Sequence, residues 1–295
     1  RHTAAVEKQG QELLASLRPD DKVLVLITRN YGLSDPVLNM GIPRLLLERG
    51  HKVITLSHLP AHDLDLSEDY PNLYWPFGQH ILSGAKLVAH HPNLYAVYLT
   101  NHGCGPDTML SYLFRKEMGD KPYLQIEVDE HFSPVGVITR IEAFLQSLEG
   151  RPAQPLPAGF SLTSVVHRPT AVAAVPERTG GPLLVPDLPP FTAYLRAYCE
   201  AAWETETRTL RLDSTTLPLG RAETSSKEYL PFPALLGGVL TAAEAESGPF
   251  QVLLPSTQGA EADGQYPWGV ETVLERQGLC RVKVIAPELE TLPAR

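Results

Sequence analysis

Short apolar runs alternate with amphipathic stretches along the first half of the chain. Runs of this kind are typical of strands buried on both faces of a sheet, and they cover residues 22–28, 52–56, 94–99 and 123–128. Stretches with helical features lie between and after them, at residues 37–49, 77–90, 106–118 and 140–148. Strands that alternate with helices over short connections predict a parallel, doubly wound sheet.

Capping residues help to place the ends of these predicted helices. Gly50 follows the first helix as a C-cap glycine, and Pro106 stands in the first turn of the third. Thr139 and Glu142 have the spacing of a capping box, so the fourth helix is predicted to begin at Arg140.

The second half repeats this pattern. Strands are predicted at residues 182–185, 207–212, 250–254 and 281–286, and helices at 192–203, 233–246 and 267–277. Nine prolines occur within residues 151–190, which favours a linker over a regular element. The fold class is therefore α/β, with two tandem Rossmann-like doubly wound parallel sheets. We expect domains at 1–150 and 182–295, joined by a Pro-rich linker at 151–181; the second is expected to be truncated.

Composition narrows the classes of partner. The net charge of −9, with no cluster of Lys and Arg, argues against nucleic acid and against an anionic membrane surface. No apolar run approaches the roughly 20 residues of a membrane span, and the polar start is not a signal peptide. Three widely spaced cysteines are no disulfide framework. These features predict a cytoplasmic protein.

Three segments that follow predicted strands carry the candidate chemistry. Because the carboxyl ends of parallel strands meet at one edge of a sheet, we expect these segments to lie together. Their residues are Arg29, Asn30, Tyr31, Asn101, His102, Gly103, Cys104, Gly105, Asp107, Asp129, Glu130 and His131.

Cys104 is the most unusual member of this set. It lies between two glycines at a predicted helix N-terminus, and that position, with Arg29 nearby, favours the thiolate form. A thiolate is both a nucleophile and a soft metal ligand. The plainer alternative is a small buried residue in a Gly-rich turn, with the acids and His131 capping helices. Cys199 and Cys280 are expected to fill core positions.

Other catalytic signatures do not appear in the sequence. It contains no GxxxxGK[ST] motif, no GxGxxG after the first strand and no GxSxG elbow.

Three sequence blocks of the first half nevertheless resemble a known family. YLTNHGCGPDT (98–108), KPYLQIEVDEH (121–131) and GVITRIEAFL (136–145) are similar to the 2-hydroxyacyl-CoA dehydratase family. The resemblance is closest to its long activase-related, 2-hydroxyglutaryl-CoA dehydratase activator-like proteins, which fuse an ATPase activator to dehydratase-like modules. Asp35-Pro36 with Asn39, and Tyr74-Trp75 with Gly78, also fit, so the resemblance covers nearly all of residues 22–148.

The second half resembles the next module of the same fusion proteins, with both of its cysteines replaced. The family pattern Gly-Lys-Glu-Cys-Tyr-Pro becomes SKEYLP at 226–231, and Gly-Pro-Cys-Arg-Phe-Gly-Gln-Tyr becomes GAEADGQY at 259–266. The residues of this degenerate second site are Lys227, Glu228, Tyr229, Glu261, Gln265 and Tyr266. We expect Tyr229 to be packed among its neighbours, so that a cysteine there would leave a void.

The resemblance implies a redox role. In the family, cysteines of neighbouring Rossmann-like domains hold a [4Fe–4S] or double-cubane cluster that receives an electron from the ATP-driven activator. Cys104 matches one ligand position, whereas a cluster needs about three or four thiolates. The remaining ligands would come from a domain absent from this chain, among the other domains or subunits of a dehydratase/activase assembly. We therefore expect the isolated chain to be cluster-free and inactive, as neither an ATPase nor a complete dehydratase.

Two alternatives remain open. The chain could be a metal-free interaction scaffold within the same assembly, in which both units only hold neighbouring domains. It could also be a mononuclear metal or thiol enzyme built on His102, Cys104, Asp129 and His131, which predicts stoichiometric metal in the isolated chain.

Overall fold

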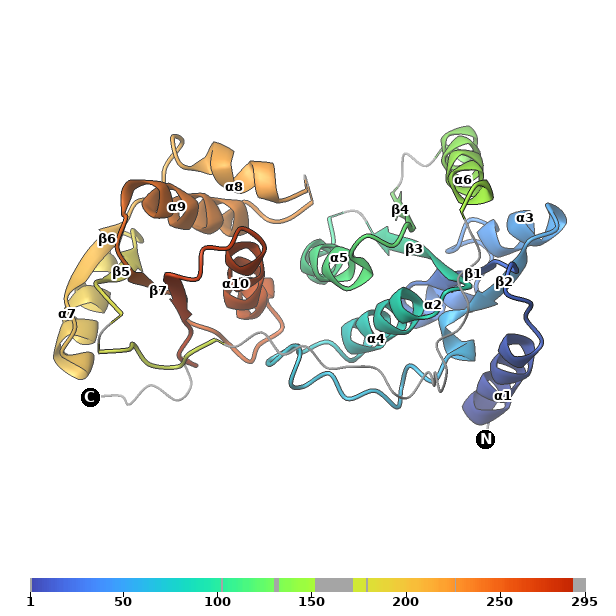
Figure 1. The fold of residues 1–295 in the computed structure, drawn as a ribbon, viewed down its shortest axis with the longest axis horizontal. Helices are drawn as coiled ribbons and strands as arrows, with labels where there is room; N and C mark the ends of the chain where they lie inside the picture. The colour runs from blue at the N-terminus through green and yellow to red at the C-terminus, as the bar shows by residue number, and fades with distance from the viewer. Residues whose placement is uncertain are drawn as a thin grey trace. The chain divides into compact units, whose positions relative to one another are not determined.

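Two four-stranded parallel sheets, each covered by helices, make up the protein (Figure 1). The computed structural model describes residues 2–101, 103–129, 133–151, 172–178, 180–225 and 227–288. The predicted α/β class with tandem Rossmann-like sheets is confirmed.

The first sheet has the strand order β2-β1-β3-β4, with all neighbours parallel. Its strands are β1 (Val23–Ile27), β2 (Lys52–Thr55), β3 (Leu94–Asn101) and β4 (Leu124–Val128). Every residue of β1 is buried, as the continuous apolar run predicts for a central strand.

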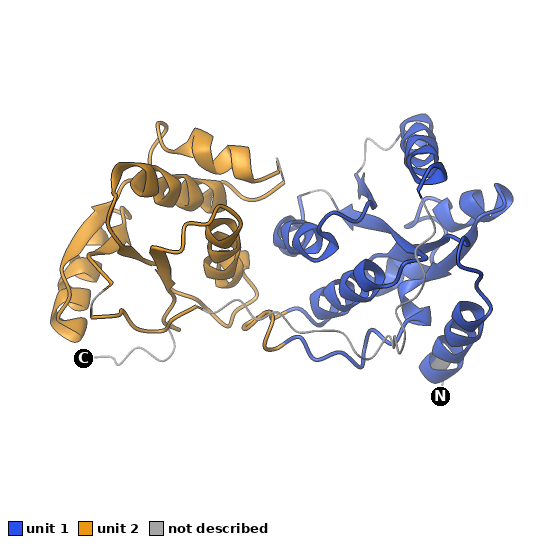
Figure 2. Ribbon diagram, in the orientation of Figure 1, with its two compact units in different colours: residues 1–66, 75–167 blue, residues 67–74, 168–295 orange. Residues whose placement is uncertain are grey.

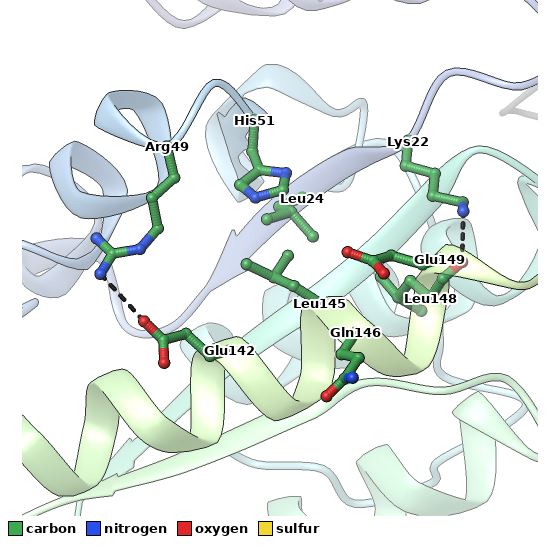
Figure 3. Close-up of a pocket in the computed structure, with 9 residues that line it drawn as sticks. All are labelled: Lys22, Leu24, Arg49, His51, Glu142, Leu145, Gln146, Leu148 and Glu149. Atoms are coloured by element: carbon green, nitrogen blue, oxygen red, sulfur yellow. Dashed lines mark hydrogen bonds and ion pairs between the residues drawn. The ribbon is translucent and has the colours of Figure 1, made fainter.

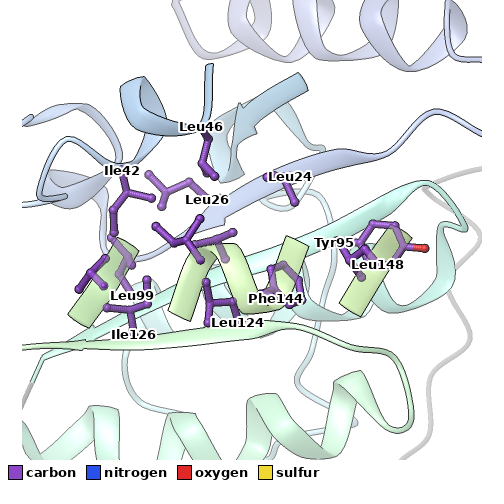
Figure 4. Close-up of a cluster of buried hydrophobic side chains, with 13 residues drawn as sticks. Leu24, Leu26, Ile42, Leu46, Tyr95, Leu99, Leu124, Ile126, Phe144 and Leu148 are labelled. Atoms are coloured by element: carbon purple, nitrogen blue, oxygen red, sulfur yellow. The ribbon is translucent and has the colours of Figure 1, made fainter. Parts of the chain in front are cut away.

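Helices cover both faces of this sheet. They are α1 (His2–Ala15), α2 (Asn30–Ser34), α3 (Ile42–Glu48), α4 (Pro76–His90), α5 (Gly105–Met118) and α6 (Pro134–Glu149), with the 3₁₀ turn η1 (Leu56–His58). On one face, Leu26 and Leu99 join a buried cluster with Leu46 of α3 and Phe144 of α6 (Figure 4). On the other face, the Tyr98 ring stacks on Phe114 of α5, with 4.2 Å between centroids.

Two predicted helix boundaries are wrong. The helix predicted over residues 37–49 begins only at Ile42, because Met40 and Gly41 have left-handed backbones with φ of 56° and 63°. Gly50, with φ of 82°, ends this helix as predicted. The helix predicted to begin at Arg140 begins at Pro134 instead, after an N-cap at Ser133.

The side chain of Thr139 explains why the second boundary fails. Its hydroxyl donates to the carbonyl of Val135 one turn earlier, inside α6, so Thr139 and Glu142 form no capping box.

The second sheet repeats the arrangement of the first, with the order β6-β5-β7-β8 and parallel neighbours. Its strands are β5 (Leu183–Pro186), β6 (Thr207–Leu210), β7 (Phe250–Leu253) and β8 (Val282–Ile285). Its helices are α7 (Thr192–Trp203), α8 (Leu217–Glu223), α9 (Pro231–Ala245) and α10 (Tyr266–Arg276), with the 3₁₀ turn η2 (Ala262–Gln265) before α10.

Helix α8 was not predicted from the sequence, and it packs unusually closely on α9. A Cβ atom on Gly220 would lie 1.8 Å from the carbonyl oxygen of Pro233, and one on Gly237 would lie 2.2 Å from the carbonyl oxygen of Thr216. The two glycines therefore let the helix backbones touch.

Each sheet has a topological switch point, where the chain reverses its direction of winding. It lies between β1 and β3 in the first sheet and between β5 and β7 in the second. Ligands of open α/β sheets bind at the carboxyl ends of the strands beside such a point.

The chain divides into two compact units, and one short segment from the first half of the sequence belongs to the second unit (Figure 2). Unit 1 contains residues 1–66 and 75–167, and unit 2 contains residues 67–74 and 168–295. Residues 67–74 lie in sequence between β2 and α4 of unit 1.

The predicted linker lies mostly outside the described residues, because residues 152–171 and 179 are not described. Within the part that is, Ala173 forms a parallel bridge with Ile285 of β8. Among the described helices, none combines the length and the apolar character that a membrane span requires.

Candidate functional site

Arg29 and Cys104 meet at the switch point of the first sheet. Arg29 follows β1 directly, and Cys104 follows β3 as the N-cap residue of α5. Arg29 Nη2 lies 2.6 Å from Cys104 Sγ. The guanidinium and the N-terminus of a 14-residue helix therefore both lie beside the Cys104 sulfur.

Asp107 fixes Arg29 and the Cys104 loop through hydrogen bonds of its carboxylate. Its Oδ1 accepts a hydrogen bond of 2.8 Å from Arg29 Nη2, and its Oδ2 accepts one of 2.8 Å from the backbone N–H of Asn101. One carboxylate thus fixes both the guanidinium and the loop that carries Cys104. The exposed fractions of the side chains are 18% for Arg29 and 5% for Asp107, so the pair is shielded from solvent.

The ring of Phe77 packs against the guanidinium of Arg29. The guanidinium carbon lies 4.2 Å from the ring centroid, within the range of a cation–π contact. Burial alone would lower the pKa of Arg29. The hydrogen bond and charge of Asp107, with the charges of Cys104 and Tyr31, outweigh it and raise that pKa.

A second contact joins the two loops closer to the surface. Asn101 Nδ2 donates to the hydroxyl of Tyr31 at 2.7 Å, and the Tyr31 side chain is itself exposed. Gly103 has a φ of 66°, which favours glycine at this turn of the loop before α5. Asn30 begins α2 with an exposed side chain, and Gly105 begins α5.

Of the third predicted segment, the structure describes Asp129 and places it at the same edge. Val128, the last residue of β4, pairs with Asn101, and Asp129 follows it. His102, Glu130 and His131 lie outside the described residues. Among the residues that are described, no group of three His, Cys, Asp or Glu side chains is arranged to hold a metal ion.

Two aromatic residues of this site were not predicted from the sequence. The sequence pattern places Phe77 only in a helix and Tyr98 only in a strand. Burial, reinforced by the charge of Asp107, raises the pKa of Tyr98 well above its ordinary value, so this phenol stays protonated beneath the site. An aromatic residue at a helix start is the only signal of Phe77 in the sequence, and it does not reveal the contact with Arg29.

The cysteines of the chain could supply one ligand of an iron–sulfur cluster, but not the full set of ligands. Cys199 is buried in the core of unit 2, where burial raises the pKa of its thiol to about 11. Cys280 is exposed, so its assignment to a core position is wrong. Cys104 alone combines partial exposure with a cationic neighbour.

In sequence, Glu261 has the same offset from the second sheet's central pairing that Cys104 has from the first. Leu94 pairs with the first residue of β1, and Cys104 lies ten residues beyond Leu94. Gln251 pairs with the first residue of β5, and Glu261 lies ten residues beyond Gln251. Both Cys104 and Glu261 are also the N-cap residues of the helical turns that follow them.

Tyr229 and Glu261 of the degenerate second site act on Tyr266. Its ring packs on Phe232, and burial raises its pKa to about 12, helped by the charges of Asp263, Tyr229 and Glu261. Glu228 is buried and accepts a hydrogen bond of 2.7 Å from the Ser225 hydroxyl.

Two further residues of the degenerate site can be placed. The amide N–H of Lys227 donates to Ser225 Oγ at 3.2 Å. Tyr229 is 42% exposed, so the expectation that it is packed among its neighbours is wrong.

A hollow of about 480 Å³ lies at the opposite, amino-terminal edge of the first sheet (Figure 3). Leu24, Leu145 and Leu148 contribute its apolar lining. Arg49 pairs with Glu142 at 3.4 Å at one end, and Lys22 donates to the carbonyl of Leu148 at the other. Arg49, Glu142 and Lys22 therefore already have partners there, and the hollow lies away from the edge where parallel sheets bind ligands.

Comparison with known proteins gives one match. Residues 1–59 match the family described as the CoA enzyme activase uncharacterised domain (DUF2229). No curated protein and no solved structure matches the chain. The matched region runs from α1 to η1 and includes Arg29 and Tyr31, but it ends before Cys104. The match relates the chain to CoA enzyme activases coarsely and assigns no role to a residue.

Proposed function

We propose that this chain is a non-ATPase part of a 2-hydroxyacyl-CoA dehydratase/activase-related redox protein. In this proposal Cys104 supplies one thiolate to an iron–sulfur cluster, and the remaining ligands come from other domains or subunits of the assembly. The observation that carries it is the 2.6 Å contact between Arg29 Nη2 and Cys104 Sγ at the switch point of the first sheet.

The residues of the site have defined tasks in this proposal. Arg29 holds the Cys104 sulfur in place, Asp107 orients Arg29, and the Phe77 ring covers one face of the guanidinium. Soft sulfur is the ligand that iron–sulfur clusters require. The activase match over residues 1–59 and the resemblance of residues 98–108 support the same assignment.

The second unit supports a different role within the same assembly. Glu261 shares the sequence offset and the N-cap role of Cys104, and a carboxylate is a hard ligand where a cluster needs sulfur. Tyr229 replaces the other family cysteine. We propose that unit 2 is a metal-free scaffold. The three free thiols are consistent with the cytoplasmic location we propose for the chain.

Iron content of the longest natural protein that contains this chain tests the proposal. Cys104→Ser should lower the iron and acid-labile sulfide bound after anaerobic reconstitution, and it should weaken the visible absorbance of the cluster. Cys280→Ser is the matched control, because this thiol is exposed and lies in unit 2. Unchanged iron and sulfide in Cys104→Ser would show that this thiolate is not a ligand.

A further inference from the structure

Tyr31 presents a free hydrogen-bond donor at the outer surface of the Cys104 site. The residue is 46% exposed, and its hydroxyl accepts a 2.7 Å hydrogen bond from Asn101 Nδ2. A phenolic hydroxyl that accepts one hydrogen bond still has a hydrogen of its own to donate. Within the described part of the chain no residue accepts that hydrogen, so it is available to a group bound at the site.

Neighbouring side-chain donors at this site are engaged or closed off. Arg29 Nη2 contacts Cys104 Sγ at 2.6 Å and donates to Asp107 Oδ1 at 2.8 Å. Arg29 Nε is buried and has no hydrogen-bond partner, so it does not reach a group that approaches from outside. The side-chain amide of Asn101 is used on Tyr31. The Tyr31 hydroxyl, in contrast, is both exposed and able to donate.

The backbone around Tyr31 keeps this hydroxyl close to Arg29. Tyr31 lies in α2, and the backbone N–H of the next residue, Gly32, donates to the carbonyl of Arg29 at 2.9 Å. Against the lowering effect of burial, the charges of Asp107, Cys104 and Tyr31 raise the pKa of Arg29. All three side chains therefore lie near the same guanidinium.

One carboxylate links the Tyr31 hydroxyl to the Cys104 sulfur. Asp107 Oδ1 accepts from Arg29, which contacts the sulfur. Asp107 Oδ2 accepts from the backbone N–H of Asn101, whose side chain donates to Tyr31. All of these contacts lie within unit 1. The hydroxyl and the sulfur are thus tied to the same buried carboxylate, each through one intermediate residue.

We propose that Tyr31 donates a hydrogen bond to a sulfur atom of the cluster that Cys104 binds, and that Asn101 is the positioning residue that orients it. The inference rests on the proposed function for the identity of the ligand. Hydrogen bonds to cluster sulfur are among the factors that set a reduction potential. Reduction adds negative charge to the acceptor and strengthens such a bond, so the donor favours the reduced form and raises the potential.

Redox titration of the longest natural protein that contains this chain, reconstituted anaerobically, tests this role. Tyr31→Phe removes the hydroxyl and keeps the ring, so bound iron and acid-labile sulfide should stay at the wild-type level. The ratio of reduced to oxidised cluster at a fixed solution potential should fall about 2-fold or more, the lower end of what one hydrogen bond contributes. Tyr194→Phe, at a residue that is 75% exposed in unit 2, is the matched control and should leave this ratio unchanged.

Asn101→Ala separates the orientation of the hydroxyl from the donation itself. It leaves Tyr31 in the chain but removes the bond that orients the hydroxyl, while the backbone N–H of residue 101 can still donate to Asp107. The ratio should fall in the same direction as in Tyr31→Phe. Adding Asn101→Ala to Tyr31→Phe should cause no further fall, because the hydroxyl on which Asn101 acts is already gone. If Tyr31→Phe fails to fold or to bind the cluster, Asn101→Ala replaces it in the titration.

The outcomes distinguish this inference from the proposed function. A wild-type ratio in fully loaded Tyr31→Phe, or in Asn101→Ala where that variant replaces it, overturns the inference and leaves Cys104 as a cluster ligand. A further fall in the double variant overturns the assignment of Asn101, because Asn101 would then act on the cluster by another route. Unchanged iron and sulfide in Cys104→Ser overturns the proposed function, and the inference falls with it.

Discussion

Asp107 Oδ1 lies 2.8 Å from Arg29 Nη2, and this same nitrogen contacts the sulfur of Cys104. Asp107→Asn keeps the shape but leaves a largely buried guanidinium without its counter-charge. Breaking such a pair should destabilise the protein by about 3 kcal/mol. Urea unfolding measures the loss. The matched control is Glu48→Gln, which removes the exposed ion pair with Arg44 and should cost at most about 0.5 kcal/mol. Equal effects of the two variants would contradict the role of Asp107.

Restoring the two family cysteines of unit 2 should be mild and should not create a cluster. Tyr229 and Glu261 are both exposed, so Tyr229→Cys with Glu261→Cys should change the free energy of unfolding by only about 0.5 kcal/mol each. Two thiolates are still fewer than a cluster requires. Anaerobic reconstitution followed by iron and sulfide assay should therefore find at most one weakly bound metal ion. A stoichiometric cluster would show that unit 2 retains ligands that have been overlooked.

Glu271 should make unit 2 less stable as the pH rises. Burial, followed by the charge of Glu275, raises the pKa of Glu271 from 4.5 to about 7. The folded state therefore holds this proton more tightly than the unfolded state. The contribution to stability is complete below pH 4.5, falls between pH 4.5 and about 7, and is lost above, by an amount on the order of 3 kcal/mol.

Glu271→Gln tests this pH dependence, because glutamine stays neutral throughout. The difference in unfolding free energy between wild type and variant should shift in favour of the variant as the pH rises through that window. A difference that stays constant with pH would contradict the assignment. Glu275→Gln is the second arm, since removing its charge should lower the pKa of Glu271.

Close contact of α8 and α9 makes Gly220 intolerant of any side chain. A Cβ atom at Gly220 would overlap the carbonyl oxygen of Pro233, and backbone cannot move aside as a flexible side chain can. Gly220→Ala should therefore cost about 3 kcal/mol or more. Gly248→Ala, where a Cβ would meet no atom within 4 Å, should change stability by less than about 1 kcal/mol. Thermal unfolding of both variants gives the comparison.

The strands were predictable because burial on both faces leaves continuous apolar runs, as in β1 and β3. Helix ends were less predictable, since they depend on backbone angles that several residues can adopt. Gly41 offered a signal for the late start of α3, but Met40, with its left-handed backbone, offered none. Thr139 and Glu142 had the right spacing for a cap in the middle of a helix.

The contacts of the candidate site that could be predicted from the sequence are those that follow from strand order. Arg29, Asn101 and Cys104 could be expected together because parallel strands bring their carboxyl ends to one edge. The seating of residues 67–74 in unit 2 could not be expected, because it rests on single side-chain amides that meet acceptors nearly 200 residues away in sequence. Local patterns record which face of an element is buried, and not which distant element covers it.

The seating of residues 67–74 also changes what a single proteolytic cut would do. Cleavage within residues 152–171 would yield an N-terminal fragment that still carries Tyr70, Asn72 and Leu73. These residues belong to unit 2, and Asn72 is hydrogen-bonded to Ser256 and Glu288 of the C-terminal fragment. The two pieces should therefore co-purify as a non-covalent pair, and the C-terminal piece produced alone would lack the hydrogen bonds of Asn72 to Ser256 and Glu288. For protein engineering, a cut at this place would give two fragments that complement each other, because the N-terminal fragment carries residues 67–74 of unit 2.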